Sequence, residues 1–233
     1  TYRFDPKNST TRAECAVVLQ RLDSSLQPFD GRETVDPTEI WITGDTDTLT
    51  ILEHFRTQQQ TSEWSCGVTS ALMVMDWYGT LGDYNEETLA QFRSNGLTPE
   101  ATSLQQLIEV FEGVGGYDLY STLDCENVYE EFTLEFIQET LANDTPIIVG
   151  WNDWGGHWQT IIGYDTMGTE TTQDDVIIVA DSYDTTDHCQ DGYGIYGAER
   201  FYYNFTFYDF FEGEDAVNDM CFLVATPSAE AAE

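Results

Sequence analysis

The sequence has 233 residues and carries 43 aspartates and glutamates against eight lysines and arginines, a formal net charge of −35. Nucleic acids and anionic membrane surfaces are therefore not expected partners, because both are bound through cationic side chains. No run of 18 apolar residues occurs, so no membrane insertion is predicted. An aromatic content of 14% is too high for a disordered chain.

The N-terminal segment, residues 1–26, contains one strong helix signal. Thr11-Arg12-Ala13-Glu14 forms a capping box, and the apolar positions that follow predict a helix over residues 11–25. Together with Tyr2-Arg3-Phe4-Asp5-Pro6, this stretch resembles the second half of an S-layer homology repeat. The resemblance implies attachment to a bacterial cell-wall polymer, whereas the alternative is an ordinary N-terminal helix. Residues 27–48, which are interrupted by prolines and glycines, are predicted to be a linker.

The main domain is predicted over residues 49–226, and its first part is mostly helical. Capping residues and apolar spacing mark the helix starts, while glycines or Asn-Gly mark most of the ends. The predicted helices span 49–55, 66–78, 86–94, 103–112 and 133–141.

The pattern changes to strands after residue 145. Short apolar or alternating runs separated by polar loops predict strands, with a helical turn at 206–211 and a polar tail at 227–233. The predicted strands span 146–151, 157–164, 176–180, 201–205 and 221–225. Helices followed by an antiparallel sheet define an α+β fold.

The five cysteines show no CxxC spacing, so neither a metal nor a cofactor is predicted. Two alternatives remain: Asp45 and Asp47 offer part of a calcium loop, and His188-Cys189 lies among aspartates. Apart from Cys66, the cysteines could form two disulfides in three connectivities, but we expect them to be free.

Cys66 stands at the start of the 66–78 helix, directly after Ser65, a predicted N-cap residue. The positive end of the helix dipole favours the thiolate, the nucleophilic form of cysteine. Gln60, six residues upstream, offers an amide NH₂ that could donate to an oxyanion, although Gln58 and Gln59 are its neighbours. An inert core thiol is the alternative reading of Cys66.

A nucleophilic cysteine needs a base, and His157 is the predicted one among three histidines. It begins a strand after Gly155-Gly156, and the next predicted strand ends at Asp181. Pairing of these strands would bring the Asp181 carboxylate to the imidazole, where a carboxylate fixes the tautomer and stabilises the imidazolium. The alternatives are a structural histidine and a turn aspartate.

These motifs, in this order, resemble the C39-like family of papain-like cysteine peptidases. The residues that carry the resemblance are Gln60, Cys66-Gly67, Gly156-His157-Trp158, Gly163-Tyr164-Asp165 and Asp181-Ser182-Tyr183. The resemblance implies a papain-like fold, catalytic Cys66, His157 and Asp181, and Gln60 as oxyanion donor. Trp64, Gly156 and Trp158, beside these motifs, are the predicted substrate-binding residues. Val68-Thr69 and Ser182 depart from the family pattern without replacing a catalytic side chain.

The sequence thus predicts an extracellular, cell-wall-associated cysteine peptidase. It would hydrolyse peptide or amide bonds of a peptide or protein substrate through a thioester. One alternative is an acyl transferase or transpeptidase that uses the same catalytic residues. The other is a catalytically idle surface-binding module.

Overall fold

The computed structural model describes residues 45–153, 155–183, 192–213 and 216–229. The chain divides into two compact units, Thr1–Asp36 and Pro37–Glu233, and every described residue belongs to the second. The segment that resembles an S-layer homology repeat, its helix at 11–25, nearly all of the predicted linker and the His188-Cys189 cluster lie outside the described residues.

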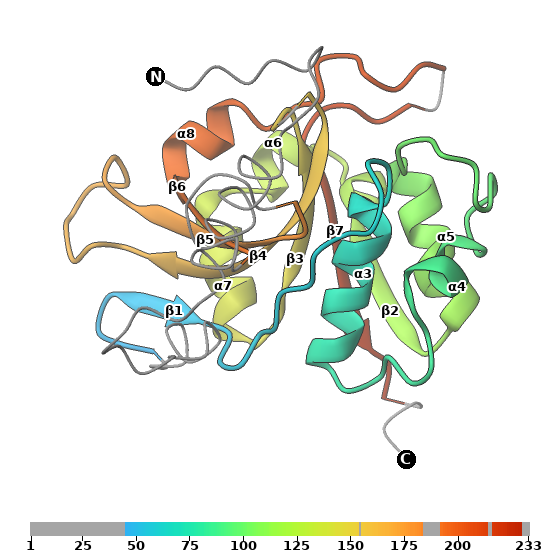
Figure 1. Cartoon of the computed structure of the whole chain (residues 1–233). Coiled ribbons are helices and arrows are strands. Elements are labelled where there is room, and N and C mark those ends of the chain that lie inside the picture. The colour runs from blue at the N-terminus through green and yellow to red at the C-terminus, as the bar shows by residue number, and fades with distance from the viewer. Residues whose placement is uncertain (1–44, 154, 184–191, 214–215, 230–233) are drawn as a thin grey trace, which may run out of the picture. The chain divides into compact units, whose positions relative to one another are not determined.

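The described part of the chain is built on one antiparallel sheet of seven strands (Figure 1). The strands are Leu49–Ile51 (β1), Tyr117–Ser121 (β2), Ile147–Trp151 (β3), His157–Asp165 (β4), Val176–Asp181 (β5), Tyr193–Gly197 (β6) and Cys221–Pro227 (β7). Their order is β2-β7-β3-β4-β5-β6. The short strand β1 pairs with the end of β4, at Gly163–Asp165, beyond the part that pairs with β3.

Helices lie beside both halves of this sheet, which makes the fold α+β as predicted. They span Cys66–Trp77 (α3), Glu86–Ala90 (α4), Leu104–Val114 (α5), Val128–Glu131 (α6), Leu134–Ala142 (α7) and Ala198–Tyr203 (α8), with a 3₁₀ turn at Thr122–Asp124 (η1). Figure 1 shows α3, α4 and α5 gathered beside β2 and β7, whereas α7 contacts β1 and β4 and α8 contacts β6. Capping boxes at Asn85 and Ser103 begin α4 and α5.

Helix α3 is the central buried element. Every residue from Cys66 to Met75 is buried, including the polar Thr69 and Ser70, so the burial of this helix extends beyond one apolar stripe. It packs against β4 and β3. Close approach depends on Gly67, because a Cβ atom there would lie 2.9 Å from the Thr102 Cβ and 3.1 Å from the Trp158 Cδ1.

Three predicted elements are wrong. Residues 206–211 do not form a helical turn, because Thr206 forms an isolated β-bridge with Asp219, and Tyr208 and Asp209 have positive φ values. Residues 49–55 do not form a helix: Leu49–Ile51 is strand β1, and the Leu52 N–H donates to the Ile162 carbonyl. Residues 201–205 do not form a strand, because Ala198–Tyr203 is helix α8. Phe201 and Phe205 are four residues apart, and their ring centroids lie 4.8 Å from each other within the core.

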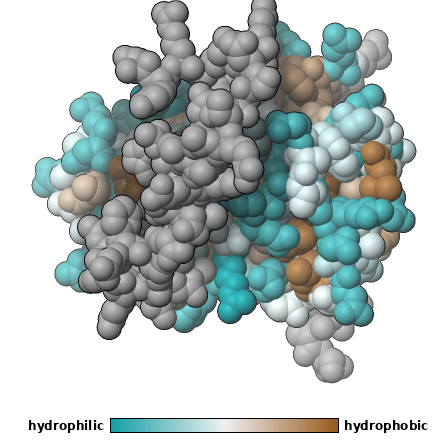
Figure 2. All heavy atoms as spheres, in the orientation of Figure 1, coloured by the Kyte–Doolittle hydropathy of each residue, from teal (hydrophilic) through white to brown (hydrophobic). Residues whose placement is uncertain are grey.

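The surface reflects the acidic composition of the chain. On the face drawn in Figure 2, hydrophilic residues surround separate hydrophobic patches. Within the described ranges, no helix has both the length and the apolar character needed to cross a membrane.

Candidate active site

The first residue of α3 is Cys66, a free thiol of which 6% is exposed. Ser65 precedes the helix as predicted, but its hydroxyl does not cap it: it donates to the Ser62 carbonyl and accepts from the Ser62 hydroxyl. Within the part of the chain that the structure describes, the Cys66 backbone N–H has no hydrogen-bond acceptor. Such an unpaired N–H is typical of the first turn of a helix.

His157 and Asp181 are brought together by the pairing of β4 with β5. In that register Gln159 lies opposite Asp181, so His157 and the carboxylate share one face of the sheet. The His157 Nε2 lies 2.6 Å from the Asp181 Oδ1, and both side chains are buried. Since Asp181 occupies Nε2, Nδ1 is the ring nitrogen left for the thiol of Cys66.

The pKa of His157 reflects these two neighbours. Burial alone would lower it, but the hydrogen bond with Asp181 and the interactions with Cys66 outweigh burial and raise the pKa to about 10. For Asp181, burial opposes ionisation, yet the hydrogen bond with His157 and its charge hold the pKa of the carboxyl below its usual value. The arrangement therefore favours an imidazolium beside an ionised carboxylate.

Gln159 is a further residue of this network that the sequence did not single out. Its Nε2 donates to the Asp181 Oδ2 at 2.7 Å and to the Asp153 Oδ2 at 3.1 Å. Its Oε1 accepts from the Trp151 indole at 2.8 Å. Gln159 is fully buried, so it fixes the orientation of the carboxylate that in turn orients His157. The available signal was its position two residues after His157 on the same strand face.

Gln60 is held beside the C-terminal end of β5, next to Asp181. Its backbone N–H donates to the Ser182 carbonyl at 2.8 Å, its Oε1 accepts from the Ser182 hydroxyl at 2.8 Å, and its Nε2 donates to the Ser62 carbonyl at 2.7 Å. One of the two hydrogens on the Gln60 Nε2 is thus donated within the protein, and the other remains available to donate to a ligand. Gln58 and Gln59 are exposed, whereas Gln60 is half-buried.

Trp64 and Gly156 lie at partly exposed positions near Cys66 and His157 in the sequence. The Arg93 guanidinium lies 4.5 Å from the centre of the Trp64 ring. Burial lowers the pKa of Arg93, while the charges of Cys66 and Glu100 raise it. Gly156 has a φ of +122°, a conformation that favours glycine.

Trp158 is placed differently from the other predicted substrate-binding residues. Only 1% of it is exposed, and its indole N–H donates to the Thr102 carbonyl at 2.7 Å. It lies under the first turn of α3 and packs against Phe207, with ring centroids 5.6 Å apart. In this position the ring supports α3 and offers almost no surface to a substrate.

The cysteines and acidic residues supply no second reactive centre in the described ranges. Cys125 and Cys221 are free, and burial raises the pKa of both thiols. Among those residues, no three His, Cys, Asp or Glu side chains are grouped so that they could hold a metal ion.

A family model described as the Peptidase_C39 like family matches residues 52–209, which contain all of the site residues above. No curated protein sequence matches the chain. Among solved structures, the chain is similar to the peptidase domain of Streptococcus ComA, a bi-functional ABC transporter involved in a quorum-sensing pathway. That match has 16% identity and a TM-score of 0.48, and it covers 75% of this chain and 100% of the other.

Proposed function

Because the chain belongs to the Peptidase_C39 like family, we propose that it is a cysteine peptidase that cleaves peptide or amide bonds of a peptide or protein substrate. Cys66 is the nucleophile, His157 the general base and acid, and Asp181 the residue that orients His157. The observation that carries the proposal is the buried 2.6 Å contact between the His157 Nε2 and the Asp181 Oδ1. Cys66 interacts with the same imidazole and helps to raise its pKa.

The chemistry that this arrangement supports is acyl transfer. The Cys66 thiolate attacks the carbonyl carbon, so that a C–S bond forms and the carbonyl oxygen becomes an oxyanion. The unpaired Cys66 N–H and the second Gln60 amide hydrogen are the proposed donors to that oxyanion. The C–N bond then breaks, and the His157 imidazolium gives its proton to the leaving amine.

Hydrolysis of the thioester completes the cycle. His157, now neutral, takes a proton from a water molecule as the water oxygen attacks the acyl carbon. The C–S bond breaks, the acid product leaves, and Cys66 returns to the thiolate beside the imidazolium. Asp181 keeps its charge throughout and stabilises the imidazolium at both ends of the cycle.

Site-resolved alkylation tests this function. We expect iodoacetamide at pH 6 to modify Cys66 about 100-fold faster than an ordinary thiol, because only the thiolate reacts. Cys125 is the internal control, since burial raises its pKa. Peptide mapping by mass spectrometry measures both rates in one sample, and His157→Gln should reduce only the Cys66 rate.

The matching activity experiment compares the wild type with Cys66→Ala on a mixed peptide library, with products identified by mass spectrometry. Cleavage that disappears in Cys66→Ala is the expected result. A Cys66 that reacts no faster than Cys125, together with cleavage that survives Cys66→Ala, would remove the proposed nucleophile.

For the location of the protein, we propose the cell wall. The support is the resemblance of residues 1–26 to half of an S-layer homology repeat. The whole chain should co-sediment with purified bacterial cell walls, and Arg12→Ala with Glu14→Ala should weaken this binding. Equal recovery of the wild type with and without cell walls would count against a wall location.

A further inference from the structure

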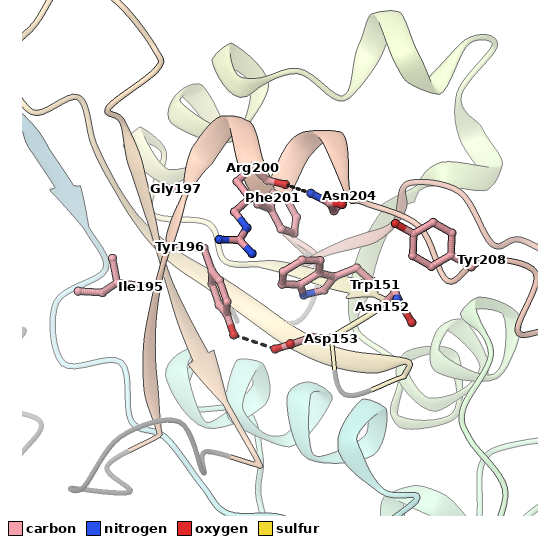
Figure 3. Close-up of a pocket in the computed structure, with 10 residues that line it drawn as sticks. All are labelled: Trp151, Asn152, Asp153, Ile195, Tyr196, Gly197, Arg200, Phe201, Asn204 and Tyr208. Atoms are coloured by element: carbon pink, nitrogen blue, oxygen red, sulfur yellow. Dashed lines mark hydrogen bonds between the residues drawn. The ribbon is translucent and has the colours of Figure 1, made fainter.

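A cavity of about 420 Å³ lies between the end of β3, the loop that follows it, strand β6 and helix α8 (Figure 3). Trp151 and Tyr196 form aromatic walls, and Ile195 and Tyr208 lie at exposed positions around it. The Trp151 and Tyr196 rings meet edge to face with centroids 5.2 Å apart. The volume is within the usual range for sites of small ligands.

Arg200 supplies the positive charge of this pocket. Figure 3 shows its side chain descending from α8 toward the space between Tyr196 and Trp151. Only three of the eight cationic residues, Arg56, Arg93 and Arg200, lie in the described ranges. Arg93 is buried and donates to backbone carbonyls. Arg200, in a chain of net charge −35, forms no ion pair within those ranges.

The opposite wall of the pocket is tied to the candidate active site. The Asp153 Oδ2 accepts from the Tyr196 hydroxyl at 2.7 Å and from the Gln159 Nε2 at 3.1 Å. Gln159 also holds Asp181, so a single side chain separates the pocket wall from the carboxylate beside His157. The Tyr196 hydroxyl and the Gln159 amide already offset part of the negative charge of Asp153. A bound anion would therefore lie next to Arg200, at the other side of the pocket.

The position of the pocket indicates which part of a substrate reaches it. Asp153 of the pocket is joined through Gln159 to Asp181, the partner of the His157 Nε2, so the pocket lies beyond His157 as seen from Cys66. In the proposed mechanism the His157 Nδ1 protonates the leaving amine, so the leaving fragment starts between Cys66 and the imidazole, and a fragment that extends past His157 is the one that would run toward the pocket. The acyl fragment stays on Cys66.

We propose that this pocket binds a carboxylate carried by the leaving fragment of a peptide substrate, with Arg200 as its cationic partner. The proposal rests on the function proposed above. A guanidinium binds a carboxylate through two parallel hydrogen bonds, and aromatic walls suit an apolar residue next to the charge. The carboxylate can belong to an acidic side chain or to the C-terminus of the fragment.

Calorimetric binding of short peptides to Cys66→Ala tests the proposal without turnover. The probes are Gly-Tyr-Gln-amide, which is neutral at its C-terminal end, Gly-Tyr-Glu-amide, with an acidic side chain, and Gly-Tyr-Gln with a free C-terminus. We expect at least one acidic probe to bind about tenfold more tightly than the neutral one, a typical gain for a charge-assisted hydrogen bond. Arg200→Gln should abolish that difference, whereas Arg56→Gln, which removes an exposed arginine outside the pocket, should keep it.

The two acidic probes identify the source of the carboxylate, and a preference for either supports the proposal. Equal affinity for all three probes, or a preference that survives Arg200→Gln, overturns it. Failure of the proposed function gives a different pattern, because Cys66 would then be unreactive while the acid preference persisted. Cleavage by the wild type without any acid preference would overturn the pocket proposal alone.

Discussion

His157 is the residue through which the other side chains of the candidate site act on one another. Its Nε2 meets Asp181, whose second oxygen is held by Gln159, and its remaining nitrogen is left for Cys66. Because both neighbours carry negative charge when ionised, the imidazolium is favoured in the folded protein. The same interactions therefore link the stability of the protein to pH.

The sign of this pH dependence follows from the two shifted groups. The pKa of His157 is raised from 6.5 to about 10, so its stabilisation is complete below pH 6.5 and is lost as pH rises toward 10. The pKa of Asp181 is lowered, so its stabilisation is present above 3.8 and is lost as pH falls further. The charged pair of His157 and Asp181 thus stabilises the folded protein most between pH 3.8 and pH 6.5.

Asp181→Asn should therefore destabilise the protein most near pH 5–6. The difference from the wild type should narrow toward pH 9, by on the order of 1 kcal/mol per pH unit. Urea unfolding at pH 5, 7 and 9 measures this difference. Asp118→Asn, at an exposed position on β2, is the matched control and should give a small difference at every pH. A difference that grows with pH would contradict the assignment of charges.

At the scale of elements, the sequence predicted what local pattern determines. The starts of α3 and β4 and the end of β5 position Cys66, His157 and Asp181, and each was predicted to within one residue. Gln159 was not found, because its partner depends on the β4–β5 register rather than on its own sequence. Strand β2 was missed since it pairs with β7, about a hundred residues later, and α8 was mistaken for a strand because aromatic residues suit both elements.

The packing of α3 against β4 determines how far Cys66 lies from His157, and Gly67 permits this close packing. In Gly67→Ala, the new Cβ would lie 2.9 Å from the Thr102 Cβ and 3.1 Å from the Trp158 Cδ1. We expect destabilisation by about 1–3 kcal/mol, the usual cost of overpacking, and slower alkylation of Cys66 as α3 shifts. Gly197→Ala is the control, because the nearest atom to its Cβ would be 3.8 Å away. Equal stability of the two variants would show that α3 can shift to accommodate the new methyl group without a loss in the free energy of unfolding.

At the scale of the whole molecule, eight lysines and arginines are too few to balance 43 aspartates and glutamates. None of the three described arginines forms an ion pair, and His157 with Asp181 is the single pair in the described ranges. Acidic groups at the surface therefore repel one another, which favours the expanded, unfolded chain at low ionic strength. This repulsion between acidic groups also makes the stability of the fold depend on the salt concentration.

Salt should stabilise this protein through screening. The Debye length falls from about 30 Å at 0.01 M to about 10 Å at 0.1 M and 3 Å at 1 M, so most of the repulsion is removed in the lower part of that range. We expect the urea midpoint to rise steeply up to roughly 0.1–0.2 M sodium chloride and then to level off. Arg56→Gln, which makes the net charge more negative, should steepen the rise. A steady linear rise to 1 M would indicate exclusion of salt from the surface instead, and a fall would mean that attractive charge pairs dominate.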